Sequence, residues 1–430
     1  MNAIVEQDDG CLAVGGVPIR KVASEVGTPV YIYDEARIRR NFRTFHKAFS
    51  RRYERFRTYF SMKANFVPAV VAALVSEGAG LDCSSMFEVA IAEALGVSPE
   101  RMLFTMCYPD DGVLSGLGKR TIPVNFNGLN EFRRFRSFIN GVDSSRLISF
   151  RLDPADSIEA EGIKLLGTKF GLPETEVIEA FKEASRIGFC RFGLHTMVGS
   201  NVTRSGHFSA VVARLVRVAE AVKAATGVPV ESIDMGGGFG IPYGDADPGL
   251  DIDQTAGEVA ETLKKMLEAW AEPLPWVIAE PGRYLVGDAG VLVASVCGVK
   301  RGARTFVGID ASSNIFMRRV LYGTSHRVLV DGHRAVGTPT EAVSVCGQLC
   351  DNNDIVVSDI RLPAVRVGDL VAILDAGAYG SVRASNFGAW PLPAEVMVSD
   401  GRYTVVRERQ SVADFMRRFF LPADTSRSGL

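Results

Sequence analysis

Residues 58–83, TYFSMKANFVPAVVAALVSEGAGLDC, contain two apolar segments of different character that meet at a lysine. The first, YFSM, is short, is typical of a buried strand, and stops at Lys63. The second is a longer apolar run, typical of a helix, that ends near Gly78, and a further strand-like segment follows at 80–85. The stretch therefore predicts a strand–helix–strand unit with a lysine at the carboxyl end of its first strand.

The same alternation continues along the chain. With the strand before Lys63, the strand-like segments number eight, the others being 80–85, 102–106, 122–126, 147–153, 192–198, 232–237 and 276–282. Amphipathic segments such as LNEFRRFRSFI and AGEVAETLKKMLEAWA separate several of them. Eight β/α units in about 250 residues predict an α/β fold of the (β/α)8 TIM-barrel type. A doubly wound sheet is the alternative, but residues of functional type follow nearly every strand, which favours the barrel.

A different pattern begins after residue 285. Short β-branched segments such as TFVGID, HRVLVDG and VRVGDLVAILDAG are separated by turn residues, which is typical of an all-β domain of Greek-key or sandwich type. The first thirty residues, which include CLAVGGVPI, are expected to add a strand to it. We therefore predict a barrel at 33–284 and a β domain formed by 1–32 and 285–430.

Composition excludes several classes of partner. The 48 basic and 50 acidic side chains leave a formal charge of −2, which argues against nucleic acid or a membrane surface. Seven scattered cysteines form neither a disulfide framework nor a zinc motif, and predict reduced thiols in a cytoplasmic protein. No signal peptide and no apolar stretch of membrane-spanning length are expected.

A glycine-rich loop, Gly236-Gly237-Gly238-Phe239-Gly240, follows the seventh strand. Glycines allow backbone N–H groups to approach a phosphate, and loops after strands seven and eight of barrels often form such a site. A dinucleotide fingerprint has a different spacing and follows the first strand. A tight turn without a ligand is the remaining alternative, and the loop alone does not decide between the two.

Two further motifs supply charged groups at strand ends. Glu280 and Arg283 close the eighth strand, where a carboxylate could pair with a protonated ring nitrogen and an arginine could hold an anion. Both this motif and the lysine at the end of the first strand have an ordinary alternative. Glu280 and Arg283 could form a salt bridge with each other, and Lys63 could be a solvated charge. Together, a lysine amine, a phosphate loop and an acid are the parts needed to hold pyridoxal 5'-phosphate as a Schiff base.

Several motifs then occur in the order of one known family. SMKAN, LDCSSMFE, GGGFG, AEPGRY, GQLCDNND and DAGAYG run almost from end to end of the chain. In this order they resemble the alanine-racemase-like (fold-type III) decarboxylases that use pyridoxal 5'-phosphate, and most closely the diaminopimelate decarboxylases. Any single motif is weak evidence, but the ordered set is specific.

The resemblance implies roles for individual residues. Lys63 would form the Schiff base, Glu280 would pair with the ring nitrogen, and Cys350 would return a proton after CO2 leaves. The residues implied in holding the cofactor also include Ser200, Gly236, Gly237, Gly238, Arg283 and Tyr379. In this family the cysteine reaches the barrel of a partner subunit, which implies a homodimer. A core thiol is the commoner fate of a lone cysteine.

Substrate choice is implied by a segment of the β domain. DASSNIFMRRVLYG, residues 310–323, resembles the segment in which an arginine and a tyrosine grip the distal carboxylate of a diacid amino acid. Those residues would be Arg318 and Tyr322, with Arg283 and Tyr379 also near the substrate. The resemblance then implies conversion of meso-diaminopimelate to L-lysine and CO2.

Two positions depart from the family. Met197 replaces a histidine whose ring stacks on the cofactor, while His195, two residues earlier, would face the same side of a strand. Asp351 follows Cys350 where a glutamate is usual, so its reach toward the distal ammonium is shorter. These changes keep open a decarboxylase of another diamino acid, or of a siderophore or antibiotic precursor, possibly carrier-tethered. A non-catalytic cofactor-binding homologue and a racemase fit less well, because Lys63, Glu280 and Cys350 are all present.

Overall fold

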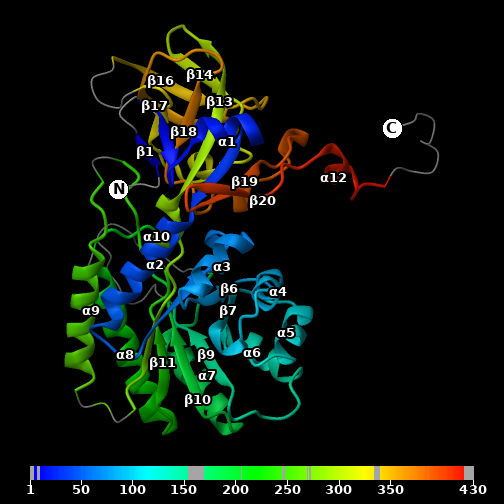
Figure 1. The fold of residues 1–430 in the computed structure, drawn as a ribbon. Helices are drawn as coiled ribbons and strands as arrows, with labels where there is room; N and C mark the ends of the chain where they lie inside the picture. The colour runs from blue at the N-terminus through cyan, green and yellow to red at the C-terminus, as the bar shows by residue number, and fades with distance from the viewer. Residues whose placement is uncertain are drawn as a thin grey trace. The chain divides into compact units, whose positions relative to one another are not determined.

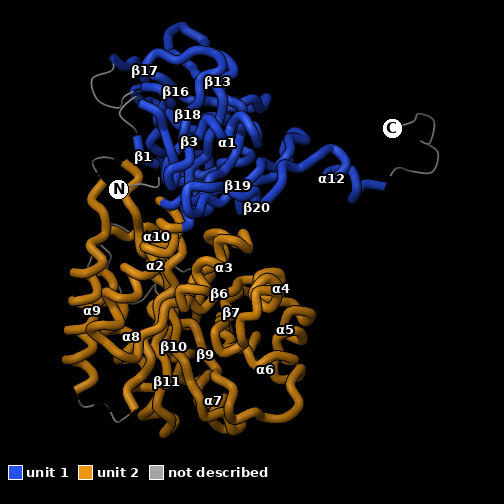
Figure 2. Tube along the Cα trace, in the orientation of Figure 1, with its two compact units in different colours: residues 1–35, 289–430 blue, residues 36–288 orange. Residues whose placement is uncertain are grey.

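The computed structural model describes residues 4–6, 10–153, 169–204, 206–244, 247–268, 270, 273–333 and 339–420. The chain divides into two compact units, coloured separately in Figure 2. One, the barrel unit, contains residues 36–288. The other, the β unit, contains residues 1–35 and 289–430.

The barrel unit is built on a closed sheet of eight parallel strands. They are β5 (Phe56–Ser61), β6 (Gly80–Cys83), β7 (Met102–Met106), β8 (Val124–Phe126), β9 (Leu147–Arg151), β10 (Arg191–His195), β11 (Val230–Asp234) and β12 (Trp276–Ala279). The last strand pairs with the first, with Val277 opposite Phe56 and Ala279 opposite Thr58. The predicted barrel is therefore confirmed, and this closure excludes the open doubly wound sheet.

Helices lie outside these strands (Figure 1). They are α2 (Glu35–Ser50), α3 (Pro68–Ser76), α4 (Met86–Ala94), α5 (Asp111–Gly118), α6 (Leu129–Arg136), α7 (Glu174–Arg186), α8 (Gly206–Thr226), α9 (Ile252–Met266) and the short α10 (Arg283–Val286). Local signals explain several of their starts: Pro68 opens α3, where its missing N–H costs nothing, and the Ser85 side chain caps α4. Apolar residues at helical spacing bury the inner face of α2, where Phe45 packs edge-on against Phe239 at 4.7 Å.

The β unit contains a sheet of nine strands. They are β4 (Val30–Asp34), β13 (Gly290–Lys300), β14 (Thr305–Ile309), β15 (Val328–Val330), β16 (Thr340–Cys346), β17 (Ile355–Pro363), β18 (Leu370–Ile373), β19 (Ala394–Ser399) and β20 (Arg402–Arg407). The N-terminal strand β4 lies inside this sheet, antiparallel to β13 and parallel to β19. The predicted sheet domain joined by an N-terminal strand is confirmed.

Smaller elements complete this unit. A three-stranded sheet contains β1 (Ile4–Glu6), β2 (Leu12–Val14) and β3 (Val17–Pro18). Three helices, α1 (Ile19–Val26), α11 (Arg318–Tyr322) and α12 (Val412–Met416), were not part of the all-β prediction. The shortness of α11 and α12 explains this, because a single helical turn leaves almost no periodic pattern in a sequence. Within the described residues, no helix has both the length and the apolarity needed to cross a bilayer.

Candidate active site

The lysine that ends the first barrel strand is held by a buried carboxylate. Lys63 lies in a 3₁₀ turn, Met62–Ala64, directly after β5. Its Nζ donates to Oδ2 of Asp82 at 2.8 Å and to Oγ of Ser61 at 3.3 Å. Asp82, on the neighbouring strand β6, is fully buried. Lys63 is therefore anchored at the carboxyl end of the barrel strands and is not a freely solvated loop charge.

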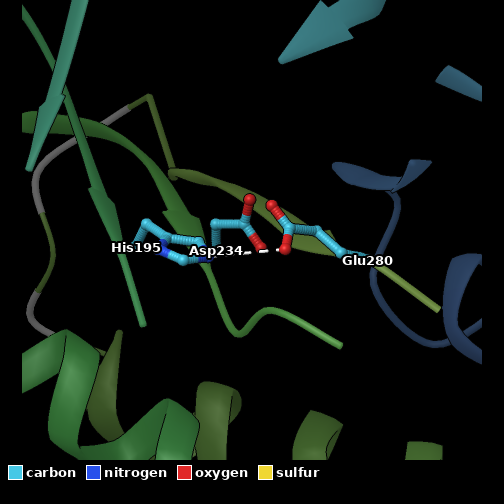
Figure 3. A group of neighbouring side chains, drawn as sticks. All are labelled: His195, Asp234 and Glu280. Carbon is cyan, nitrogen blue, oxygen red and sulfur yellow. Dashed lines mark hydrogen bonds and ion pairs between the residues drawn. The ribbon is translucent and has the colours of Figure 1, made fainter. Parts of the chain in front are cut away.

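Three more titratable side chains meet at the ends of the next strands around the barrel. His195 ends β10, Asp234 ends β11, and Glu280 follows β12 (Figure 3). They are 1%, 4% and 2% exposed. The Nε2 of His195 lies 3.4 Å from Oε2 of Glu280, and Oδ1 of Asp234 accepts a hydrogen bond from the backbone N–H of Gly236. The barrel thus gathers two carboxyl groups and an imidazole in a site closed to water.

The two carboxyl groups differ in protonation. Burial raises the pKa of Asp234 well above its ordinary value, and the charge of Glu280 raises it further. Burial also raises the pKa of Glu280, but His195 and Lys63 outweigh it and bring the pKa down to about 2. Since two adjacent buried carboxylates cannot both ionise, we assign the charge to Glu280 and the proton to Asp234.

The charged carboxylate has unused acceptor capacity. Among the described residues, Oε1 of Glu280 has no hydrogen-bond partner although it is buried. A buried, ionised oxygen without a donor is costly, so its environment suits a cationic donor. The protonated nitrogen of a pyridine ring is such a donor. Oε1 of Glu280 therefore fits the predicted contact between this carboxylate and the ring nitrogen of pyridoxal 5'-phosphate.

The glycine loop packs tightly against two neighbouring segments. A Cβ at Gly236 would lie 2.4 Å from the carbonyl oxygen of Thr196, and one at Gly237 would lie 2.7 Å from that of Glu280. Gly238 accepts a hydrogen bond from the backbone N–H of Val202 at 2.8 Å. Only glycine permits so close an approach, and Gly236 and Gly238 also have φ of +69° and +96°. Residues 236–238 thus form a loop without side chains, here called the cradle, in which a side chain at any of the three positions would lie against neighbouring backbone.

Met197 lies beside this cradle. A Cβ added at Gly236 would lie 3.0 Å from the Cβ of Met197, and a Cβ added at Gly237 would lie 3.9 Å from its Cε. The strand β10 ends at His195, so strand alternation does not extend from His195 to Met197. His195 and Met197 have different neighbours. The imidazole of His195 lies beside Glu280, while the side chain of Met197 lies beside Gly236 and Gly237.

An arginine adds positive charge near the cradle. Arg283, the first residue of α10, is 9% exposed. Its Nη1 donates to the hydroxyl of Tyr243, and its Nη2 lies 3.5 Å from Oγ of Ser200. Ser200 directly follows Gly199, whose carbonyl oxygen lies against Gly238. A guanidinium, a hydroxyl and a glycine backbone together suit a phosphate group.

The other predicted residues belong to the β unit, where the best defined is Arg318. It is buried, and its Nε donates to Nε2 of His326 at 3.0 Å. Because Nε2 of His326 must accept, the imidazole proton lies on Nδ1, which donates to the carbonyl oxygen of Leu374 at 2.8 Å. His326 is therefore neutral and fixes the direction of Arg318. Tyr322, the last residue of α11, is exposed.

Cys350 is presented by a loop that a buried aspartate closes. Asp354 accepts hydrogen bonds from the backbone N–H of Ser313 at 2.7 Å and of Leu349 at 2.8 Å. These bonds tie the loop between β16 and β17 to the segment that precedes α11. Cys350 and Asp351 lie exposed at its tip, and Asp351 accepts from the N–H of Asn353 at 2.8 Å.

The sequence prediction missed the roles of Asp82, Asp234 and Tyr243. Asp82 gave a usable signal, because it is the one charged residue of the strand GLDC, whereas the strand of Asp234 also contains Glu231 and Ser232. A buried carboxylate needs compensating partners, so such a position indicates a site. Tyr243 gave no such signal, since its contact with Arg283 joins residues far apart in the chain.

A glycine substitution tests the cradle. We expect Gly236→Ala to lower the free energy of unfolding by about 2 kcal/mol more than Gly96→Ala does, because it adds a backbone clash to the strain of positive φ. Gly96 is the matched control, with φ of +72° and open space around its Cβ position. Denaturant unfolding measures both variants. Equal losses would show that the Thr196 segment yields and that the packing is not restrictive.

Comparison with known proteins gives one consistent result. The family model described as pyridoxal-dependent decarboxylase, pyridoxal binding domain, matches residues 35–287. The diaminopimelate decarboxylase of Methanothermobacter thermautotrophicus is 36% identical over 97% of both chains, and that of Archaeoglobus fulgidus is 32% identical over 96% of this chain and 98% of its own. The crystal structure of the M. jannaschii diaminopimelate decarboxylase with L-lysine has a TM-score of 0.90 at 27% identity, and the match covers 98% of each chain.

Proposed function

The chain belongs to the pyridoxal-dependent decarboxylases, and we propose that it converts meso-diaminopimelate to L-lysine and CO2. It is a carboxy-lyase that uses pyridoxal 5'-phosphate. For the substrate, the observation that carries the proposal is the buried, oriented guanidinium of Arg318. Such a group suits the distal carboxylate of a diacid. Full-length relatives that are diaminopimelate decarboxylases support the same substrate.

In this proposal the barrel unit holds the cofactor. When bound, pyridoxal 5'-phosphate supplies a conjugated ring that takes up the electron pair left as CO2 departs. Lys63 provides the amine that attaches it, with Asp82 orienting that amine. Charged Glu280 holds a proton at the ring nitrogen, and neutral Asp234 adds no second charge. Met197 packs against the ring where a histidine is usual.

The phosphate is assigned to the cradle. Gly236, Gly237 and Gly238 bring their backbone close to it, while Ser200 and Arg283 supply a hydroxyl and a positive charge. Tyr379 of the β unit is proposed as a further cofactor contact. Apart from Tyr379, all of these groups belong to the barrel unit, where Arg283 lies beside Ser200 and the glycines pack against the segment around Ser200.

The β unit is proposed to bind the substrate and return a proton. Arg318 and Tyr322 take the distal carboxylate, and Asp351 faces the distal ammonium. Cys350 donates its thiol proton to the carbon that has lost CO2, so that one C–C bond is replaced by one C–H bond. We propose that Cys350 serves the barrel of a partner subunit in a cytoplasmic homodimer. The exposure of Cys350 at a loop tip supports this, because an exposed thiol can enter a second chain.

A direct assay tests the function. We expect CO2 release from meso-diaminopimelate with L-lysine as the amine product, and much slower release from lysine, ornithine and arginine, which lack a distal carboxylate. No turnover of meso-diaminopimelate, by protein whose cofactor is still reducible by borohydride, would overturn the proposal. Met197 and Asp351 would then mark a decarboxylase of another, larger or tethered, amino acid.

Replacement of the proposed proton donor gives a further prediction. We expect Cys350→Ala to slow amine release by about 10²-fold, the usual contribution of a positioned general acid, while cofactor binding stays unchanged. Cys297→Ala is the matched control, because Cys297 is also an exposed thiol of the β unit. Amine and CO2 are measured separately. An unchanged rate and product in Cys350→Ala would place the donor elsewhere.

A further inference from the structure

Arg383 lies between two tyrosines to which the proposed function assigns roles. Its Cζ is 5.4 Å from the ring centroid of Tyr322 and 5.7 Å from that of Tyr379. We propose that Arg383 is a specificity-determining residue that binds the distal carboxylate of the substrate beside Arg318. This inference rests on the proposed function, because it extends the same substrate site to a residue that the family motifs did not indicate.

The charge of Arg383 is available for a ligand. Among the described residues its guanidinium forms no ion pair and no side-chain hydrogen bond, and its contacts are the two aromatic rings. Asp375, the acidic residue of the same loop, is paired with Arg327 at 2.9 Å. Ring faces satisfy the positive charge in part but none of the N–H donors, which lie in the guanidinium plane. Those donors suit a carboxylate.

The backbone that carries Arg383 is fixed at its start. Arg383 ends a 3₁₀ turn, Ser381–Arg383. The hydroxyl of Ser381 donates to Oε2 of Glu395 at 2.8 Å, and the hydroxyl of Tyr33 donates to the same carboxylate. Glu395 is itself buried and paired with Arg407 at 2.8 Å. This network holds the turn against the sheet.

The same backbone is fixed after Arg383 as well. Asn314 and Ser385 exchange two hydrogen bonds, from Nδ2 of Asn314 to the carbonyl oxygen of Ser385 at 3.0 Å and from the N–H of Ser385 to the carbonyl oxygen of Asn314 at 2.9 Å. Asn314 belongs to the segment that leads into α11. The turn of Arg383 and the helix of Tyr322 are thus tied together, so the guanidinium is preorganised between the rings.

The arrangement has a consequence for substrate class. Arg318 brings a buried guanidinium to the same helix as Tyr322, and its Nε donates to Nε2 of His326. A second guanidinium at Arg383 would double the positive charge available to the distal end of the substrate. The site then favours amino acids whose far end carries a carboxylate and disfavours simple diamino acids such as ornithine, whose far end is only a cation.

The test uses the holoenzyme and the variants Arg383→Met, Arg383→Lys and Arg402→Met. Arg402 is the control, an exposed arginine at the start of β20. We expect Arg383→Met to raise KM for meso-diaminopimelate about 10-fold with kcat little changed, the size of one charge-assisted contact. Arg383→Lys should recover part of the loss, and Arg402→Met should equal the wild type. Inhibition by the product L-lysine, which keeps the distal carboxylate after CO2 has left the other end, should weaken by a similar factor.

Direct binding supplies a readout that does not depend on turnover. Calorimetry with pimelate, a dicarboxylate without amino groups, should give a Kd about 10-fold weaker for Arg383→Met than for the wild type. Titration with pyridoxal 5'-phosphate separates the two possible anions. Weaker cofactor binding with unchanged pimelate binding would assign Arg383 to the phosphate and overturn the proposal.

The remaining outcomes separate this inference from the proposed function. If the wild type turns over meso-diaminopimelate but Arg383→Met changes neither KM nor pimelate binding, the inference is wrong and the function stands. If the wild type does not turn over meso-diaminopimelate but Arg383→Met weakens pimelate binding, the function is wrong and the anion site stands. Equal thermal midpoints for the variants show that each has folded.

Discussion

The Lys63→Ala variant is expected to lose turnover by at least about 10⁴-fold, the order of loss when the covalent group of a catalytic unit is removed. Without the amine the cofactor has no covalent attachment, and borohydride should no longer reduce it onto the chain. The measurements are CO2 release and the mass of the borohydride-treated protein. The Ser61, Asp82 and Glu280 side chains remain, so the fold and non-covalent cofactor binding should persist.

The control for this loss is Lys47→Ala, which removes an exposed lysine of α2 and should leave activity unchanged. Normal turnover by Lys63→Ala would contradict the assignment of the cofactor lysine. The variant also tests the shared site. Mixed with Cys350→Ala and allowed to exchange subunits, it should form hybrid dimers in which one site has both residues intact, so activity should partly return. No recovery on exchange would contradict the proposed partner-subunit role of Cys350.

The second large effect is expected for Glu280→Gln, with a loss in kcat of about 10³-fold. The amide keeps the shape of the side chain but removes the negative charge that holds a proton at the ring nitrogen. In the folded protein Glu280 is ionised, because its pKa is brought down to about 2. The uncharged amide therefore removes a charge that is present at neutral pH, and steady-state CO2 release measures the result.

Asp234→Asn is the matched control for Glu280→Gln. Asp234 carries a proton, since burial and the neighbouring Glu280 raise its pKa, so an amide imitates its native state. The Asn oxygen can still accept the hydrogen bond from the N–H of Gly236. We expect a loss of less than about 10-fold, well below that of a missing charged group. Comparable losses in both variants would show that the charge is not confined to Glu280.

The sequence by itself determined the order of elements in the barrel. The alternation of short apolar strands and longer amphipathic helices depends on spacing along the chain, and each of the eight predicted strands is present. It also predicted a lysine at a strand end, which the structure places beside Asp82, and a glycine loop after the seventh strand. These features are local, because strand and helix periods and the steric freedom of glycine act over a few neighbouring residues.

Only the tertiary structure decided which partner each polar group meets. Asp82 reaches Lys63 from an adjacent strand, and the charge on Glu280 depends on burial and on residues of two other elements. The neutral state of His326 follows from its place between Arg318 and the Leu374 carbonyl, and the availability of Arg383 follows from its two aromatic neighbours. Protonation and charge pairing depend on distance and solvent exclusion, which closure of the barrel and folding of the sheet impose on residues that are remote in sequence.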